Sequence, residues 1–308
     1  MPLQYHAGQI EVQCEANTRP VAEMLAGWVG PVGEFVRVAD LIFLAVQDDA
    51  EELRFIAVSG KAPLIEVSGG RSIRFPGLTV PVNGDQILAG GLAISLAQLR
   101  RARVNGMLVQ DPLGWTLEAH EAFTNCRKYV APSIAVDDAP RYGPSDADVL
   151  PIDDGWLAGV VGTAETSFLA SISPDGQPDV SHRGGRPGFL RFDPAAARLE
   201  WDEYVGDGML KSAGNVRATG SVTLLVLDIA SGDAAEITGA GTYRTLRTLR
   251  EARSEALEQH GEHYPVQGAM EMRITGARRI RSLVAARRRV DRALRITSRS
   301  SPDDQAPQ

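Results

Sequence analysis

A faint internal repeat constrains the fold of this chain more than any single motif does. The matched segments keep roughly the same order and spacing, and they are 60–67 with 185–192, 84–88 with 206–210, and 102–106 with 235–239. Two copies of one small unit would pack as a pseudo-twofold pair and bury equivalent faces. The junction between the copies is therefore the natural place for a ligand cleft.

Both halves are dominated by patterns typical of short β-strands. Residues 41–46 form a compact apolar run that an acidic turn closes, which is typical of a buried strand in a hairpin. In contrast, residues 114–132 have the composition of a helix that runs into a cationic turn. Further helices are expected at 21–28, 156–162, 208–218 and 244–259, and a last strand at 270–274. The predicted fold class is mainly β, with two tandem small barrels and short flanking helices.

The boundary between the halves follows from composition. Pro, Asp, Gly and Ser replace apolar periodicity after residue 132, which predicts a linker at 136–150. The linker separates an N-terminal barrel at 1–135 from a C-terminal barrel at 151–297, and residues 298–308 are expected to be a disordered tail. With 308 residues, the chain is long enough for two domains with separate cores.

Charge, cysteine content and the distribution of apolar residues argue against a nucleic-acid partner, a disulfide-rich protein and a membrane protein. A formal net charge of −7 argues against nucleic acid, because a phosphate-binding surface needs a basic footprint. Cys14 and Cys126 are too few for a disulfide framework. The start of the chain lacks a signal-peptide pattern, and no apolar stretch reaches the length of a membrane span. We therefore expect a cytoplasmic protein with reduced thiols and no membrane partner.

Residues 181–215 gather the groups that an anion-binding site needs. His182, Arg183 and Lys211 supply cations, hydroxyl groups lie beside them, and several glycines let a ligand approach the main chain closely. On this stretch alone, a second interpretation stays open, in which the segment holds ordinary turns with solvated charges.

Several of these motifs resemble one family. Ser181-His182-Arg183-Gly184-Gly185, the turn at 202–207, Gly214-Asn215 and residues 238–241 are similar to the pyridoxamine 5′-phosphate oxidase-like, FMN-binding split-barrel proteins. Residues 5–8 and 125–129 resemble a two-barrel branch of that family. The resemblance covers most of the chain from Tyr5 to about Ile280. It implies two split barrels, FMN in a groove between them, and a flavin-dependent oxidoreductase with a small-molecule substrate.

The resemblance also implies roles for particular residues. The FMN phosphate would meet the strand of Ser181, His182, Arg183 and Gly184 and the helix start of Lys211 and Ser212, in line with anion binding at helix N-termini. The flavin or its ribityl chain would lie near Tyr204, Gly206, Asp207 and Asn215. Asp207 departs from the Gly-Asn of this branch and places a carboxylate near the expected phosphate. His182 and Tyr204 are the candidate catalytic residues.

The expected number of cofactors is at most one per chain, since the first half has ordinary residues at most of these positions, such as Ala89 opposite Lys211. A deazaflavin, or no cofactor, remains an alternative to FMN. The rival function is a non-catalytic barrel pair that binds a ligand or serves as an interaction module. Assembly into a homodimer is left open.

Three further features have two interpretations each. His260 and His263, near Glu258 and Glu262, are the only histidines with a spacing suited to a metal, and we expect no metal there. Cys126 is either a thiol activated by the cations that follow it or a structural cysteine. The arginine-rich segment 278–295 is either a solvated basic segment or a contact for an anionic partner.

Overall fold

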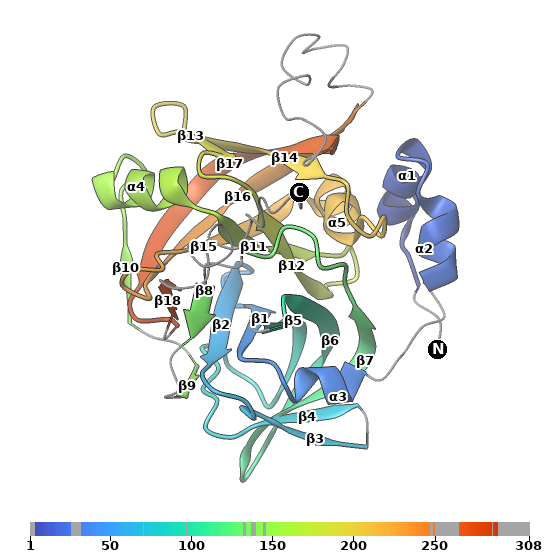
Figure 1. The fold of residues 1–308 in the computed structure, drawn as a ribbon, viewed down its shortest axis with the longest axis vertical. Coiled ribbons are helices and arrows are strands. Elements are labelled where there is room, and N and C mark those ends of the chain that lie inside the picture. The colour runs from blue at the N-terminus through green and yellow to red at the C-terminus, as the bar shows by residue number, and fades with distance from the viewer. Residues whose placement is uncertain are drawn as a thin grey trace, which may run out of the picture.

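The computed structural model describes residues 4–25, 32–69, 71–96, 98–131, 134–136, 140–143, 146–246, 249, 265–284 and 286–288. Within these ranges, the chain is mainly β and forms two antiparallel barrel-like sheets, which lie one above the other in Figure 1. The expected fold class, two tandem barrels with short flanking helices, is confirmed.

The first barrel is an eight-stranded sheet in the order β3-β4-β7-β6-β5-β1-β2-β9. Its strands are β1 (Leu41–Gln47), β2 (Leu53–Ser59), β3 (Glu66–Ser68), β4 (Ser72–Phe75), β5 (Gln86–Ser95), β6 (Arg100–Asp111), β7 (Gly114–Thr124) and β9 (Arg141–Tyr142). A separate two-stranded sheet pairs β8 (Ile134–Val136) with β18 (Ala286–Arg288).

The second barrel has the order β12-β11-β15-β16-β17-β14-β13, and β10 pairs with β17. Its strands are β10 (Ala147–Val149), β11 (Thr166–Ile172), β12 (Pro178–Gly184), β13 (Leu190–Asp193), β14 (Arg198–Tyr204), β15 (Ser221–Leu227), β16 (Ala234–Thr245) and β17 (Val266–Ile280). The helices are α1 (Ala7–Glu15), α2 (Arg19–Leu25), α3 (Val32–Val36), α4 (Gly155–Thr163) and α5 (Lys211–Thr219).

The two barrels are topological copies of each other. Read from the opposite end and without β9, the strand order of the first barrel is β2-β1-β5-β6-β7-β4-β3. The second barrel has the same order with every strand number raised by ten, if β10 is left out. Even an irregularity recurs, because the register shift at Asn105/Gly106 in β6 matches the shift at Thr238/Gly239 in β16. The matched segments 102–106 and 235–239 therefore occupy equivalent places in the two sheets.

One of the expected repeat pairs is wrong. Residues 86–88 begin strand β5, whereas residues 206–210 lead into helix α5. The first barrel has no helix between β4 and β5, where residues 76–85 form turns and bends. Ala89 lies within β5, so it is not the counterpart of Lys211. The second barrel thus contains a helix, α5, at a position where the first barrel has none. Helix α5 borders the groove described below.

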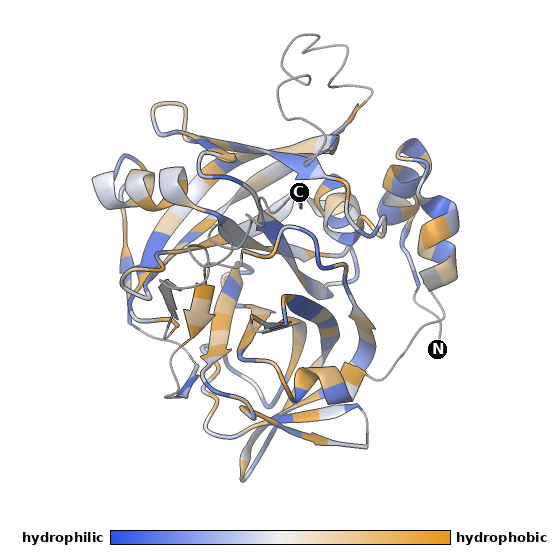
Figure 2. Cartoon of the chain, in the orientation of Figure 1, coloured by the Kyte–Doolittle hydropathy of each residue, from blue (hydrophilic) through white to orange (hydrophobic). Residues whose placement is uncertain are grey.

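A shared apolar layer joins the barrels. Strand β1 is buried on both faces: Ile42 and Leu44 lie in the core of the first barrel, while Leu41 and Phe43 pack toward the second. The ring centroids of Phe43 and Phe168 are 4.1 Å apart. Burial on both faces explains why this strand reads as a continuous apolar run instead of alternating. The hydrophobic colouring of neighbouring β2 in Figure 2 belongs to the same layer.

The expected helix at 114–132 is wrong, because residues 114–124 form strand β7. Glu, Ala and His favour a helix by composition, yet the apolar residues recur at every second position. Trp115 and Leu117 are buried, while Thr116 is half-buried and Glu118 is exposed. A period of two fits a sheet with one face on the core, and tertiary packing overrides helix propensity here.

Other sequence expectations agree with the structure or lie outside it. Helices α4 and α5 fall within one to three residues of the expected 156–162 and 208–218, and α2 covers part of 21–28. Strand β17 contains 270–274 and is much longer. Most of 244–259, the histidine pair at 260 and 263, residues 289–295 and the tail lie outside the described residues. In the described part of 278–295, Arg278, Arg279 and Arg281 form ion pairs with Glu236, Asp233 and Asp148 of the chain itself. No helix among the described residues is long and apolar enough to cross a membrane.

The N-terminal helices pack on the second barrel although they precede the first, and Figure 1 shows α1 and α2 beside α5. Contact between α1 and α5 is so close that a Cβ atom added at Gly214 would lie 2.4 Å from the Cα atom of Gln9. Within the expected linker, β9 pairs with β2 and β10 pairs with β17. The connection between the barrels is thus built into both sheets.

Candidate functional site

A groove between the two barrels gathers nine of the ten residues that the sequence singled out. The nine are Ser181, His182, Arg183, Gly184, Tyr204, Gly206, Asp207, Lys211 and Ser212. Asn215 instead lines a second cavity of about 490 Å³, whose wall also contains Lys211. The enclosed part of the groove measures about 90 Å³.

The second barrel supplies one wall through β12 and the start of α5. Gly184 is required in β12, since a Cβ atom there would lie 2.1 Å from the carbonyl oxygen of Tyr129. Leu210, the N-cap residue of α5, has a left-handed conformation with φ 49°, and its side chain makes no capping hydrogen bond. Among the described residues, no side chain is seen to accept a hydrogen bond from the first amide groups of α5. A strained residue at such a place is typical of a functional site.

The first barrel supplies the opposite wall. Arg101 and Arg103 on β6 are residues that the sequence analysis missed, whereas Asn125, Cys126 and Tyr129 after β7 belong to the motif at 125–129, which was singled out without a role in the site. A sequence signal for the arginines exists, because residues two apart in a strand share a face. Arg101 and Arg103 share one face of β6, and Ala102 and Val104 beside them are buried apolar residues, so the two arginines mark a polar position in the core.

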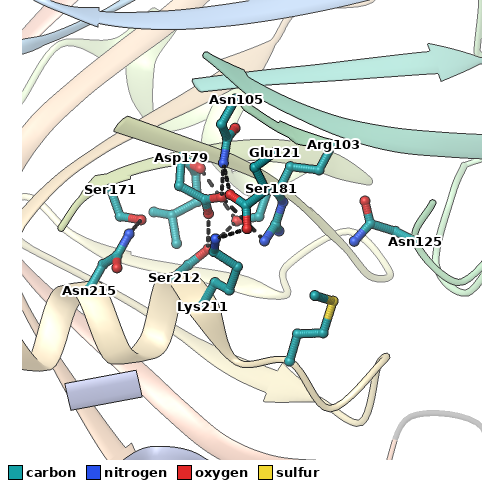
Figure 3. A network of polar contacts seen from close by, with 12 residues as sticks. Arg103, Asn105, Glu121, Asn125, Ser171, Asp179, Ser181, Lys211, Ser212 and Asn215 are labelled. Carbon is teal, nitrogen blue, oxygen red and sulfur yellow. Dashed lines mark hydrogen bonds and ion pairs between the residues drawn. The ribbon is translucent and has the colours of Figure 1, made fainter. Parts of the chain in front are cut away.

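A buried polar network connects the walls, as Figure 3 shows. At its centre lies Asp179, which is 2% exposed. Its carboxylate accepts hydrogen bonds from Asn105 Nδ2 and Ser212 Oγ, both at 3.2 Å, and forms an ion pair with Arg103 Nη1 at 3.3 Å. Residues of both barrels thus meet on one carboxylate, which fixes the floor of the groove.

The cations assigned to a phosphate are already paired with carboxylates. Arg183 Nε donates to Glu203 Oε1 at 2.6 Å, and Arg183 Nη1 donates to Ser181 Oγ at 2.7 Å. Lys211 pairs with Glu121 of the first barrel. Each of these charges is thus compensated within the chain, which weakens its pull on a further anion.

Asp207 links the loop before α5 to the first barrel. Asn125 Nδ2 donates to its Oδ2 at 2.9 Å, and the backbone N–H of Met209 donates to its Oδ1 at 3.1 Å. Tyr204 stands nearby, with its ring centroid 5.4 Å from that of Tyr129. An aromatic pair from both barrels therefore lies on the wall of the groove.

His182 is held on both ring nitrogens. Nδ1 lies 2.5 Å from Arg101 Nη1, and Nε2 lies 2.8 Å from Thr166 Oγ1. A guanidinium can only donate, so Nδ1 accepts and Nε2 carries the proton that Thr166 accepts. The pKa of His182 lies well below its ordinary value because the ring is withdrawn from water and faces the Arg101 and Arg183 charges. The imidazole is neutral, and neither nitrogen is free for a ligand.

A stability measurement against pH checks this neutral histidine. Because the folded-state pKa of His182 is depressed below 6.5, the unfolded chain binds the proton first, and stability falls as pH decreases below about 6.5. The pKa of His120 is also lowered, so this residue contributes to the loss of stability at low pH in the same direction. We expect His182→Gln to reduce the loss between about pH 6.5 and 5 in urea unfolding. A slope in the variant equal to that of the wild type would contradict the assignment.

Two buried polar atoms at the groove have no hydrogen-bond partner in the described part of the chain. These are Nε of Arg103 and Oδ1 of Asn125. Arg101 is 8% exposed, and its guanidinium forms no ion pair with any described residue. Unsatisfied buried donors and acceptors are uncommon, and they mark places where a ligand or water completes the site.

Comparisons with known proteins give matches only among solved structures. No family model and no curated protein matches the chain. HupZ from Group A Streptococcus is 15% identical, with 39% of this chain and 88% of that chain covered and a TM-score of 0.31. A pyridoxamine 5′-phosphate oxidase-related, FMN binding protein from Nostoc punctiforme is 13% identical, with 43% and 81% covered and a TM-score of 0.29.

A protein related to general stress protein 26, of the pyridoxinephosphate oxidase family, from Clostridium acetobutylicum is 11% identical, with 41% and 86% covered and a TM-score of 0.28. Each match covers about two fifths of this chain. The matches thus include proteins of the class that the sequence resembles.

Among the residues described, no three His, Cys, Asp or Glu side chains are grouped so that they could hold a metal ion. The two cysteines are both free; Cys14 is exposed and Cys126 half-buried. Arg101 Nη2 lies 3.6 Å from the sulfur of Cys126. The thiol therefore belongs to the wall of the groove and is accessible from it.

Proposed function

We propose that the groove between the barrels binds FMN and that the chain is a flavin-dependent oxidoreductase for a small-molecule substrate. One observation carries the proposal: nine residues chosen from sequence motifs of the second barrel converge on one groove, which the first barrel closes with polar groups of its own. FMN would supply the redox chemistry, and the protein would supply binding, orientation and electrostatics.

The residues present fit such a ligand in three respects. Arg103 Nε and Asn125 Oδ1 are buried without partners and offer one donor and one acceptor. The start of α5 has no side-chain cap, and its amide groups favour an anion. Tyr129 and Tyr204 provide flat apolar surface suited to a ring system.

Size determines how the ligand would lie. The enclosed space of about 90 Å³ is well below the roughly 300–1,000 Å³ of typical ligand pockets. Only the phosphate end would enter it, and the ring system would lie toward the open side beside Tyr204. The residues that would hold FMN are the nine named above other than His182, whose ring nitrogens are both engaged, together with Arg101, Arg103 and Asn125.

Titration with FMN tests the proposal. We expect one FMN per chain, an absorbance band in the blue, and at least tenfold weaker binding of riboflavin, which lacks the phosphate. Gly206→Trp should abolish binding without unfolding the protein, since a Cβ atom at Gly206 meets nothing within 4 Å and the larger side chain would project into the groove. Gly162→Trp on α4 is the matched control, because its site is equally open and is not part of the groove.

The alternative is a non-catalytic ligand-binding or interaction protein, and the charge pairing in the site favours it. Arg103, Arg183 and Lys211 each have a carboxylate partner, and His182 has no free nitrogen. If neither FMN nor a deazaflavin binds, the alternative holds. The oxidoreductase proposal is supported if a flavin binds, if a reductant bleaches its blue absorbance band, and if the band returns when an oxidised substrate is added.

A further inference from the structure

We propose that the floor of the groove is a small oxyanion pocket built across the two barrels, in which Arg101 supplies the charge, Arg103 Nε supplies a hydrogen bond, and the first turn of α5 supplies backbone amides. Its ligand is a phosphate or carboxylate group. The sequence motifs point to Arg183 and Lys211 for this task, whereas the geometry points to the first barrel. The proposed function is needed only to say what the anion is attached to.

Arg101 is the groove cation whose charge is not compensated by direct contact. The other three groove cations, Arg103, Arg183 and Lys211, are paired with Asp179, Glu203 and Glu121. Arg101 is just as buried, yet it donates to the neutral His182 and to the sulfur of Cys126. Burial lowers its pKa, while the sulfur of Cys126 and, through space, the carboxylate of Asp207 act in the opposite direction. A buried guanidinium without a carboxylate partner is destabilising, and a bound anion would supply the missing negative charge.

Arg103 adds a directed donor to that charge. Its Nη1 is used by Asp179, while its Nε is buried without a partner. Arg103 is 6% exposed, so water does not readily replace a missing acceptor. Leaving such a donor unsatisfied destabilises the folded chain, and an oxygen atom of a bound anion would supply the missing acceptor.

The third component comes from the second barrel. Helix α5 has nine residues, and residues 210–213 at its start line the same groove. Its first amides lack a side-chain cap, and a helix N-terminus carries a partial positive charge. The enclosed 90 Å³ exceeds the roughly 10–15 Å³ that one water needs, so a small oxyanion can be accommodated.

Cys126 provides a reporter for this pocket. The chain has two cysteines, and Cys14→Ser leaves a single thiol that is hydrogen-bonded to Arg101. A neutral disulfide reagent would then report access to the groove through the rate at which it modifies Cys126. The probe is inorganic phosphate, titrated at constant ionic strength, with acetate in a second series to separate tetrahedral from planar oxyanions.

We expect phosphate or acetate to slow modification of Cys126 with a saturable midpoint. Arg101→Gln should raise that midpoint at least tenfold, whereas Arg100→Gln, the neighbouring exposed arginine, should leave it within twofold. Asp207→Asn should lower the midpoint, because it removes the negative charge that acts on Arg101. Arg101→Lys, which keeps the charge, should show an intermediate effect.

In the modification experiment, two results would overturn the inference: equal midpoints for Arg101→Gln and Arg100→Gln, or no protection by either anion. The thermal midpoint of each variant, with and without phosphate, separates loss of folding from loss of binding and serves as the readout if Cys126 does not react. Protection by phosphate without FMN binding would defeat the proposed function alone. FMN binding that Arg101→Gln leaves unchanged would defeat this inference alone.

Discussion

Glu236→Gln is expected to lower the free energy of unfolding by about 3–5 kcal/mol, the cost of breaking a buried ion pair by removing one partner. Glu236 is fully buried where the barrels meet. Its carboxylate accepts from Arg54 Nη1 at 3.1 Å, from Arg278 Nη2 at 2.6 Å and from the backbone N–H of Phe55 at 2.9 Å. A neutral amide leaves Arg278 without a carboxylate partner among the described residues, whereas Arg54 keeps Asp48 and Glu52.

Glu52→Gln is the matched control for that experiment. Glu52 pairs with the same Arg54, but its side chain is 43% exposed. Surface ion pairs contribute about 0–1 kcal/mol, so the control should shift the urea midpoint little. Equal shifts in the two variants would show that Glu236 does not hold the barrels together.

Gly214→Ala is expected to destabilise the protein by about 1–3 kcal/mol through overpacking. The added Cβ atom would lie 2.4 Å from Gln9 Cα and 2.7 Å from Gln9 N, and neither backbone atom can move without shifting α1. Separation of the helices would also weaken the hydrogen bonds from His6 and Gln9 to Asn215 Oδ1. Thermal unfolding and faster proteolysis within α1 measure the effect.

Gly159→Ala on α4 makes the same substitution in a second helix, where the new Cβ atom would meet nothing within 4 Å. Alanine favours a helix over glycine by about 0.5–1 kcal/mol, so this variant should gain stability. Opposite signs for the two variants would confirm that contact with α1 decides the outcome. A gain at both positions would refute the close packing of α1 on α5.

The repeat and the motifs of the second half were readable from the sequence because they depend on local patterns. Strand β1 was recognised as an apolar run, and the bulge at Gly106 fell opposite the bulge at Gly239. The residues of the second groove wall were found in the same way, through short motifs around Ser181 and Lys211. These residues line one groove because β12, β14 and the start of α5 all belong to the second barrel.

What the sequence could not give depends on contacts distant in the chain. Arg101 and Arg103 gain their importance from Asp179 and α5, which lie about 80–110 residues later. The ion pairs that Arg183 forms with Glu203 and Lys211 forms with Glu121 likewise cannot be predicted from composition. Strand β7 was missed because its helix-favouring residues were weighed above their period of two.

Because helix α5 is present only in the second barrel, amino-acid substitutions can alter the two walls of the groove independently. In an assembly of two identical subunits, any substitution is made twice and alters every equivalent site together. Here Arg101 stands on one wall and Lys211 on the other, each encoded once. A single codon change can therefore reshape one side of the groove while the facing side stays as it was, which lets the affinity for a ligand and its orientation diverge separately.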